Sequence, residues 1–142
     1  MDCVSSMVTR DLVMEVVHPD DRVEQVPVLL RYETSDPYAV HADFLTGSDR
    51  RVRWCFSREL MSEGLEGATG HGDVRIWPVS RGGVNMINIA LMSDDGAAVV
   101  QALKADVAEF LGSSYGVCPP GVESAFVDLD AGLRSLFEAE GA

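Results

Sequence analysis

The chain has 142 residues with 23 acidic and 11 basic side chains, which gives a formal net charge of −12. A field of this sign repels polyanions, so the charge argues against nucleic acid and anionic membranes as partners. A chain of this length fits one domain, and we expect residues 1–142 to form it. The sequence has no secretory signal and no long apolar run, which predicts a cytoplasmic protein without direct membrane insertion.

Four strands are expected in the first part of the chain. Apolar and polar residues alternate with a period of two, as in the run from Tyr38 to Phe44. The turn signals His18-Pro19-Asp20-Asp21 and Ser35-Asp36-Pro37 separate the first three segments. We expect the four strands to form an antiparallel meander, and they cover residues 7–17, 26–33, 38–45 and 51–56.

A short helix and a hairpin are expected next. Ser57 is a suitable N-cap for a helix over residues 58–65, and the glycine-rich stretch 64–72 predicts a flexible loop after it. Residues 73–79 and 84–92 flank Ser80-Arg81-Gly82-Gly83, whose glycines permit the backbone of a hairpin loop.

The last third of the chain predicts two helices. Ser93, Asp94 and Asp95 supply capping side chains, and the helix ends at Gly112 after apolar residues at helical spacing, namely Val100, Leu103, Val107, Phe110 and Leu111. A second helix begins near Asp130 and buries Leu133, Leu136 and Phe137. Strands followed by helices indicate the α+β class, here twisted antiparallel β-sheets, a meander plus a hairpin, packed by C-terminal helices.

Patterns typical of catalysis and metal binding are nearly absent. The histidines have no metal-ligand spacing, and they are His18, His41 and His71. Cys55 could act as a nucleophile only if its strand paired with that of His41, and a core thiol in a sheet is the simpler interpretation. Three carboxylates lie without any acid–base spacing, namely Asp43, Glu59 and Asp73. We therefore expect no metal, no cofactor and no enzymatic activity.

Aromatic residues interleaved with arginines raise the alternative of a single-stranded nucleic-acid platform. The aromatics are Tyr32, Tyr38, Trp54 and Trp77, and the nearby arginines are Arg51, Arg53 and Arg75. Tryptophans in strand patterns more often belong to a core, and the net charge opposes this binding. Nucleic acid is therefore not the favoured partner.

Candidate partner-binding residues fall in two places. Arg50, Arg51 and Arg53 form the densest basic cluster of an acidic chain. They form either a solvated turn that pairs with nearby acids or a docking patch for an acidic partner segment. The second place is the glycine stretch, with the candidates Gly67, Gly70 and His71; no long helix follows it, which argues against a phosphate cradle.

Five short motifs occur in order between Val26 and Pro78. They are Val-Pro-x-x-Leu-Arg-Tyr at 26–32, Asp-Pro-Tyr-Ala-Val at 36–40, Val-x-Trp-x-Phe at 52–56, Glu-Gly-Leu at 63–65 and Gly-Asp-Val-Arg-Ile-Trp-Pro at 72–78. In this order and spacing they resemble the SsgA-like family, regulators of sporulation-specific cell division in filamentous actinomycetes. A weaker similarity extends to residues 119–121 and 128–130.

The resemblance implies a protein without known catalysis that controls septation, and with it septum-site selection. It implies that the chain recruits or stabilises the tubulin-like division protein FtsZ at the division septum, with another SsgA-like protein as a second partner. It also implies a fold like that of Whirly and mitochondrial guide-RNA-binding proteins, and a ring-like homo-oligomer, expected to be a trimer. The alternatives are a Whirly-like single-strand binder and, with less support, a small-molecule enzyme.

Overall fold

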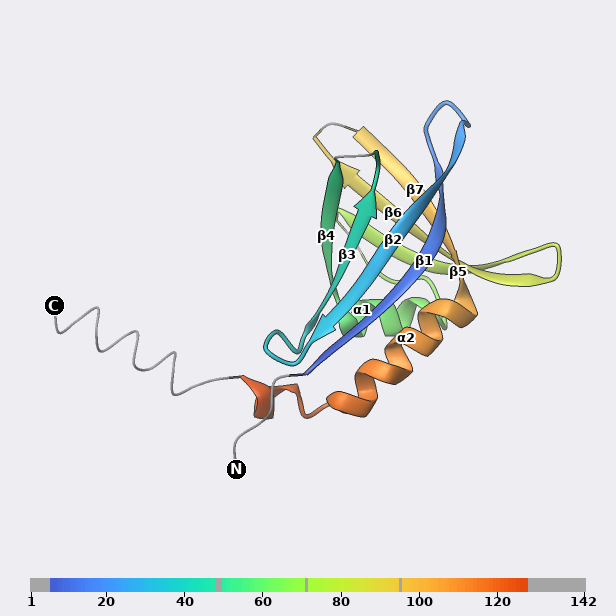
Figure 1. Cartoon of the computed structure of the whole chain (residues 1–142). Helices are drawn as coiled ribbons and strands as arrows, with labels where there is room; N and C mark the ends of the chain where they lie inside the picture. Colours follow the sequence, from blue (N-terminus) through green and yellow to red (C-terminus); the bar gives the residue numbers. More distant parts are fainter. Residues whose placement is uncertain (1–5, 48–49, 71, 95, 128–142) are drawn as a thin grey trace, which may run out of the picture.

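The computed structural model describes residues 6–47, 50–70, 72–94 and 96–127 (Figure 1). Their strands form one antiparallel sheet of seven, in the order β4-β3-β2-β1-β7-β6-β5. The elements in chain order are β1 Met7–Val17, β2 Val23–Glu33, β3 Ala39–Leu45, β4 Arg51–Ser57, α1 Arg58–Gly64, β5 Val74–Arg81, β6 Val84–Ser93, β7 Gly96–Leu103, α2 Lys104–Val117 and the short 3-10 helix η1 Glu123–Phe126.

The predicted meander is confirmed, because β1 to β4 pair in sequence order and antiparallel. The predicted hairpin is confirmed as β5 and β6. The α+β class is therefore right, but the meander and the hairpin are parts of a single sheet. They are joined where β1 pairs with β7, from Glu15 opposite Gln101 to Val17 opposite Val99.

The segment predicted as the start of a long helix is a strand instead. Gly96 to Leu103 form β7, which pairs with β6 in register from Ser93 opposite Gly96. Two residues, Asp94 and Asp95, separate the strands, and this short connection is typical of a hairpin. Val100 and Ala102 alternate into the core, so burial in the sheet outweighs the helix preference of the alanines.

The helix that follows differs from the prediction at both ends. It begins at Lys104 and continues to Val117, past Gly112. Its spacing of Val107, Phe110 and Leu111 is confirmed as the buried face. The second predicted helix, near Asp130, lies outside the described residues.

The core fills the inside of the curled sheet, where α1 and α2 pack at one end (Figure 1). Helix α2 contacts β1, β6 and β7 and touches α1. The inward side chains alternate along every strand, and the largest fully buried ones include Tyr32, Phe110, Met14, Leu30 and Met61.

The glycine stretch is more fixed than a flexible loop. The Thr69 N–H donates to Ile76 O at 2.8 Å, and the Ile76 N–H donates back to Thr69 O at 2.9 Å. Gly64 packs so closely that a Cβ would collide with the Ile76 side chain. Gly70 has a φ of 97°, and a Cβ there would lie 2.5 Å from Val74 O. The stretch therefore fastens α1 to β5.

Candidate functional site

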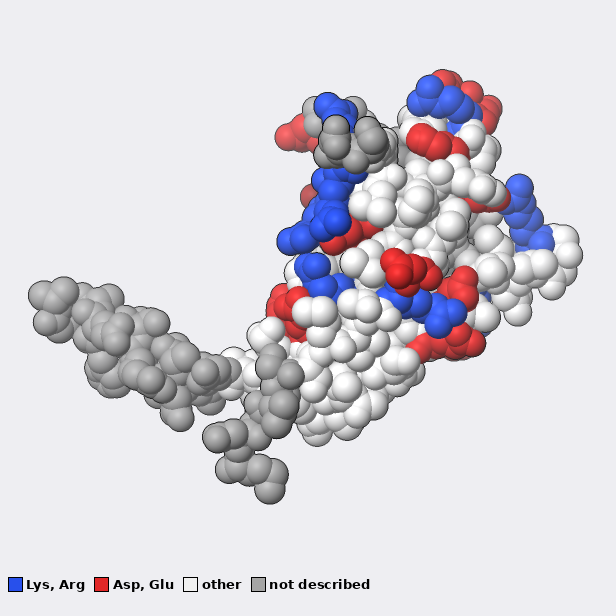
Figure 2. All heavy atoms as spheres, viewed as in Figure 1, with Lys and Arg blue, Asp and Glu red and all other residues white. Residues whose placement is uncertain are grey.

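An arginine-rich strand forms one edge of the sheet. Strand β4 stands at one end of the strand order, and Figure 2 shows blue side chains along this edge. The side chains of Arg51 and Arg53 are 57% and 53% exposed. Beneath them lies Asp43 of β3, directly opposite Arg53 in the strand register and only 1% exposed. We call Arg50, Arg51 and Arg53 the arginine edge.

Three guanidinium groups share the carboxylate of Asp43. Arg53 Nε donates to Asp43 Oδ1 at 2.9 Å, while Arg31 Nη1 and Arg51 Nη1 lie 3.6 and 3.8 Å from Oδ2. Burial alone would raise the pKa of Asp43, but the hydrogen bond and the three positive charges outweigh it and lower this pKa. Arg31 also pairs with Glu33 at 3.1 Å. Three guanidiniums thus face two carboxylates, which leaves a positive surface.

The six predicted partner-binding residues divide into two groups. Arg50, Arg51 and Arg53 lie on or next to β4, at one end of the strand order. Gly67 and Gly70 lie in the segment that leads to β5, the strand at the other end. His71 lies outside the described residues. Arg51 and Arg53 pair with a nearby acid, as the first interpretation predicts, and still expose about half of each side chain. The docking interpretation stays a prediction.

A buried arginine that the sequence did not single out joins three parts of the fold. Arg58 begins α1 with 3% of its side chain exposed. Its Nη1 donates to Cys118 O at 2.8 Å and to Ser114 O at 3.3 Å, and its Nη2 donates to Glu123 Oε1 at 2.8 Å. Its guanidinium also lies 4.6 Å from the ring centre of Tyr32. Arg58 therefore ties the end of α2 and the segment after it to the sheet.

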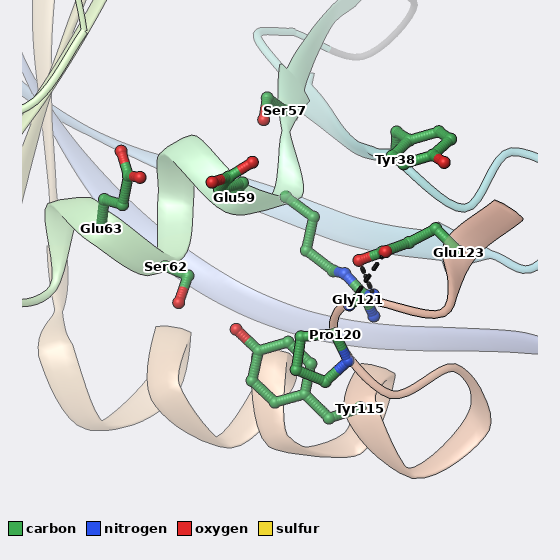
Figure 3. A pocket seen from close by; sticks show the side chains of 10 residues that line it. Tyr38, Ser57, Glu59, Ser62, Glu63, Tyr115, Pro120, Gly121 and Glu123 are labelled. Atoms are coloured by element: carbon green, nitrogen blue, oxygen red, sulfur yellow. Dashed lines mark hydrogen bonds and ion pairs between the residues drawn. The ribbon is translucent and has the colours of Figure 1, made fainter.

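A cavity of about 360 Å³ opens beside Arg58 and is lined by Tyr38, Tyr115, Glu59, Glu63 and Glu123 among others (Figure 3). The hydrogen bond from Arg58, together with the N–H of Gly121, lowers the pKa of Glu123. This carboxyl is consequently ionised at neutral pH and cannot act as a general acid. Burial, followed by a hydrogen bond with Cys118, raises the pKa of Tyr32. Arg58 and its partners therefore serve to hold α1, the sheet and the segment after α2 together.

The condition for a Cys55 nucleophile is met in part. His41 lies directly opposite Cys55 in the β3–β4 register, and its Nε2 is 3.1 Å from Asp36 Oδ2. However, burial and then the charge of Asp36 raise the pKa of Cys55, which keeps the thiol protonated. Contrary to the core thiol expected, Cys55 is also exposed. This array therefore lacks the activated sulfur that nucleophilic catalysis needs.

The other chemical alternatives gain no support from the geometry. Tyr32 is buried, Trp54 lies on the inner side of β4, Trp77 lies on the outer side of β5, and Tyr38 is in a turn, so these aromatics share no stacking surface. Within the described residues no group of His, Cys, Asp and Glu could hold a metal ion. In the same part of the chain, no helix is long and apolar enough to cross a membrane.

Comparisons with known proteins agree with the motifs. The model of the family described as "Streptomyces sporulation and cell division protein, SsgA" matches residues 26–123. The "Sporulation-specific cell division protein SsgB" of Streptomyces coelicolor is 41% identical over 94% of this chain and 97% of its own length. The protein of the same name from Thermobifida fusca is 40% identical over 92% of this chain and 95% of its own length.

Solved structures give the same result. The crystal structure of an SsgA-like sporulation-specific cell division protein from Thermobifida fusca has a TM-score of 0.85 and 38% identity, and covers 95% of this chain and 98% of that one. A Streptomyces coelicolor SsgB structure has a TM-score of 0.82 and 40% identity, over 86% and 96% of the two chains. The Whirly likeness stays a prediction. With a family match across most of its length and relatives at about 40% identity, the chain belongs to the SsgA family of sporulation and cell division proteins, and it is most similar to SsgB.

Proposed function

We propose that this chain is a non-enzymatic regulator of sporulation-specific cell division that acts in septum-site selection by recruiting or stabilising FtsZ. The observation that carries the proposal is the similarity to the Streptomyces coelicolor SsgB, 41% identical over 94% of this chain. The relative's name places it in sporulation-specific division, and near-complete coverage of both chains supports the same role here. We place the protein in the cytoplasm, at the division septum.

The arginine edge is the contact surface that fits this role. The chain as a whole has a net charge of −12 and repels an acidic partner, whereas the exposed guanidiniums of this edge attract one locally. Complementary charges speed the encounter and fix the register of the partner. Such a site favours a partner segment rich in Asp and Glu.

Self-association completes the proposal. We expect a homo-oligomer, a trimer, with another SsgA-like protein as a further partner. An oligomer presents several copies of one weak contact to a polymer of repeating subunits, and this raises the overall affinity without a new contact. Sedimentation equilibrium at micromolar concentration tests this part, and a strict monomer contradicts it.

The main test is co-sedimentation with FtsZ polymers. Wild-type protein is expected to enter the pellet with FtsZ and to increase the amount of polymer. Arg51→Ser is expected to weaken this binding about two- to fivefold, which corresponds to the free energy of one cross-strand charge pair. Arg22→Ser is the matched control, because Arg22 is also exposed and lies outside the arginine edge. No co-sedimentation of the wild type, together with no effect on FtsZ polymer, contradicts the proposal.

A further inference from the structure

The two edges of the sheet are not equally accessible. At the β5 edge, Thr69 already occupies both hydrogen-bonding groups of Ile76, and Pro78 has no N–H to offer. Strand β4, at the other edge, has neither a proline nor a bridging residue along its described length. Within the described residues, β4 is therefore the edge at which another strand can pair.

The hydrogen bonds to β3 identify the free groups of β4. The Arg58 N–H donates to Tyr38 O at 2.8 Å, and the Thr46 N–H donates to Arg50 O at 3.1 Å. In an antiparallel pair the bonded residues alternate, so even-numbered residues between these two bonds face β3. Arg51, Arg53 and Cys55 consequently point their N–H and C=O groups away from the sheet. No backbone bond from another described segment reaches them.

The side chains along this edge alternate in chemistry. Arg51 and Arg53 stand on the outer face, more than half exposed, while Val52 points to the inner face and is 43% exposed. A strand paired here would place residues opposite Arg51 and Arg53 on the outer face, with the residue between them beside Val52. Acid, apolar, acid is the order that matches these three positions.

We propose that β4 receives, by strand addition, an extended segment of a partner protein in which two acidic residues flank an apolar one. Backbone bonds to Arg51, Arg53 and Cys55 hold the segment, and the side-chain order selects it. This rests on the proposed function and specifies how the partner is bound. Pairing of β4 with the β4 of a second copy sets Arg against Arg, and this like-charge contact disfavours self-pairing.

The test is amide hydrogen exchange followed by NMR on the full-length chain. In the free protein, the amides of Arg51, Arg53 and Cys55 are expected to exchange quickly and those of Val52 and Trp54 slowly. A capped Thr-Glu-Val-Glu-Val-Glu-Thr peptide is expected to slow the first three amides at least tenfold. The same peptide N-methylated along its pairing edge keeps its charge but loses the donors, so it is expected to have no such effect.

Two further probes complete the test. A peptide of the same composition with its glutamates in one block is expected to bind more weakly. Arg51→Ser is expected to weaken the alternating peptide about two- to fivefold, because one charge pair is lost while Arg53 still covers Asp43.

Several outcomes overturn the proposal. Fast exchange of the three amides at saturation rules out strand addition. Equal binding of the alternating and block peptides rules out selection by the order of acidic and apolar side chains. If FtsZ co-sediments nevertheless, the proposed function stands and only the mode of binding is wrong.

The chain itself contains Asp128-Leu129-Asp130, which has the same order of acidic, apolar and acidic side chains. Tighter binding of a peptide of residues 126–132 assigns the edge to this segment instead of a partner, and slow exchange already in the free chain contradicts an edge left open for a partner.

Discussion

Two arginine–carboxylate pairs in this molecule have opposite patterns of burial. In the pair of Arg58 with Glu123, the arginine is 3% exposed and the carboxylate 16%. In the pair of Arg53 with Asp43, the carboxylate is 1% exposed and the arginine 53%. The first arginine uses its donors on the backbone of α2 and on Glu123. The second keeps donors directed to solvent.

The difference teaches that the buried partner decides the role of the pair. A buried guanidinium must have all its hydrogen bonds met inside the protein, so its pair holds the fold together. A buried carboxylate holds one N–H of an exposed guanidinium and leaves its other N–H donors available to a partner. We therefore expect substitution of Arg58 to change mainly the stability of the fold, and substitution in the arginine edge to change mainly the binding of a partner.

Removing Arg58 is expected to have the largest effect. Arg58→Ala removes the donor of Glu123 Oε1 and of the Cys118 carbonyl, while Ser114 O keeps the Cys118 N–H. Loss of one partner of a buried pair costs about 3–5 kcal/mol. Urea unfolding measures this loss, with Arg22→Ala as the exposed control, expected within about 0.5 kcal/mol of the wild type. A loss for Arg58→Ala no greater than that of the control would remove the distinction between the two pairs.

Asp43→Asn tests the second pair from its buried side. The substitution keeps the shape but removes the charge that Arg53, Arg51 and Arg31 share, and we expect a loss of about 1–3 kcal/mol in unfolding free energy. The freed guanidiniums are expected to bind the alternating acidic peptide more tightly than in the wild type. Weaker binding with a folded variant would mean that Asp43 positions the arginines rather than competing for them.

Acid pH weakens both pairs. The pKa values of Asp43 and Glu123 are lowered in the folded state, so their stabilisation is complete above the unfolded values of about 4 and is lost as the pH falls through the folded values. Unfolding free energy measured between about pH 6 and pH 3 is expected to fall with pH in the wild type. Asp43→Asn and Glu123→Gln are each expected to flatten this dependence, and an unchanged slope in both contradicts the assignment.

Arg51→Ser is expected to have the smallest effect on stability. Its Nη1 lies 3.8 Å from Asp43 and its side chain is 57% exposed, and exposed pairs of this kind contribute about 0–1 kcal/mol. Thermal unfolding is expected to place this variant beside the wild type even though it weakens partner binding. A stability loss as large as that of Asp43→Asn would show that the arginine edge serves the fold first.

The alternation of the first four strands made the meander predictable. Once the turn near residues 46–50 is placed, counting along the strands pairs Asp43 with Arg53, so the counterion of the arginine edge could also be found from sequence. The motifs identified the family because they span turns and core positions in a fixed order. These features depend on residues close together in the chain.

The features missed depend on distant contacts or on conflicting local signals. Arg58 reads as an ordinary residue of a first helical turn, while its partners Ser114 and Glu123 lie 56 and 65 positions away. Strand β7 was missed because Ala97 and Ala98 favour a helix and Val100 and Leu103 fit its spacing. Pairing with β6 and β1 decides that segment, and sequence periodicity does not carry this information.

The hydrogen bonds between Thr69 and Ile76 have a consequence for growth of the sheet. A sheet with two open edges can add subunits at both sides and extend into a fibre. Here Thr69 and Pro78 block the middle of the β5 edge, so a strand taken up at β4 lengthens the sheet on one side only. The domain is thus univalent along the sheet direction, and a larger assembly must be built through its faces or helices.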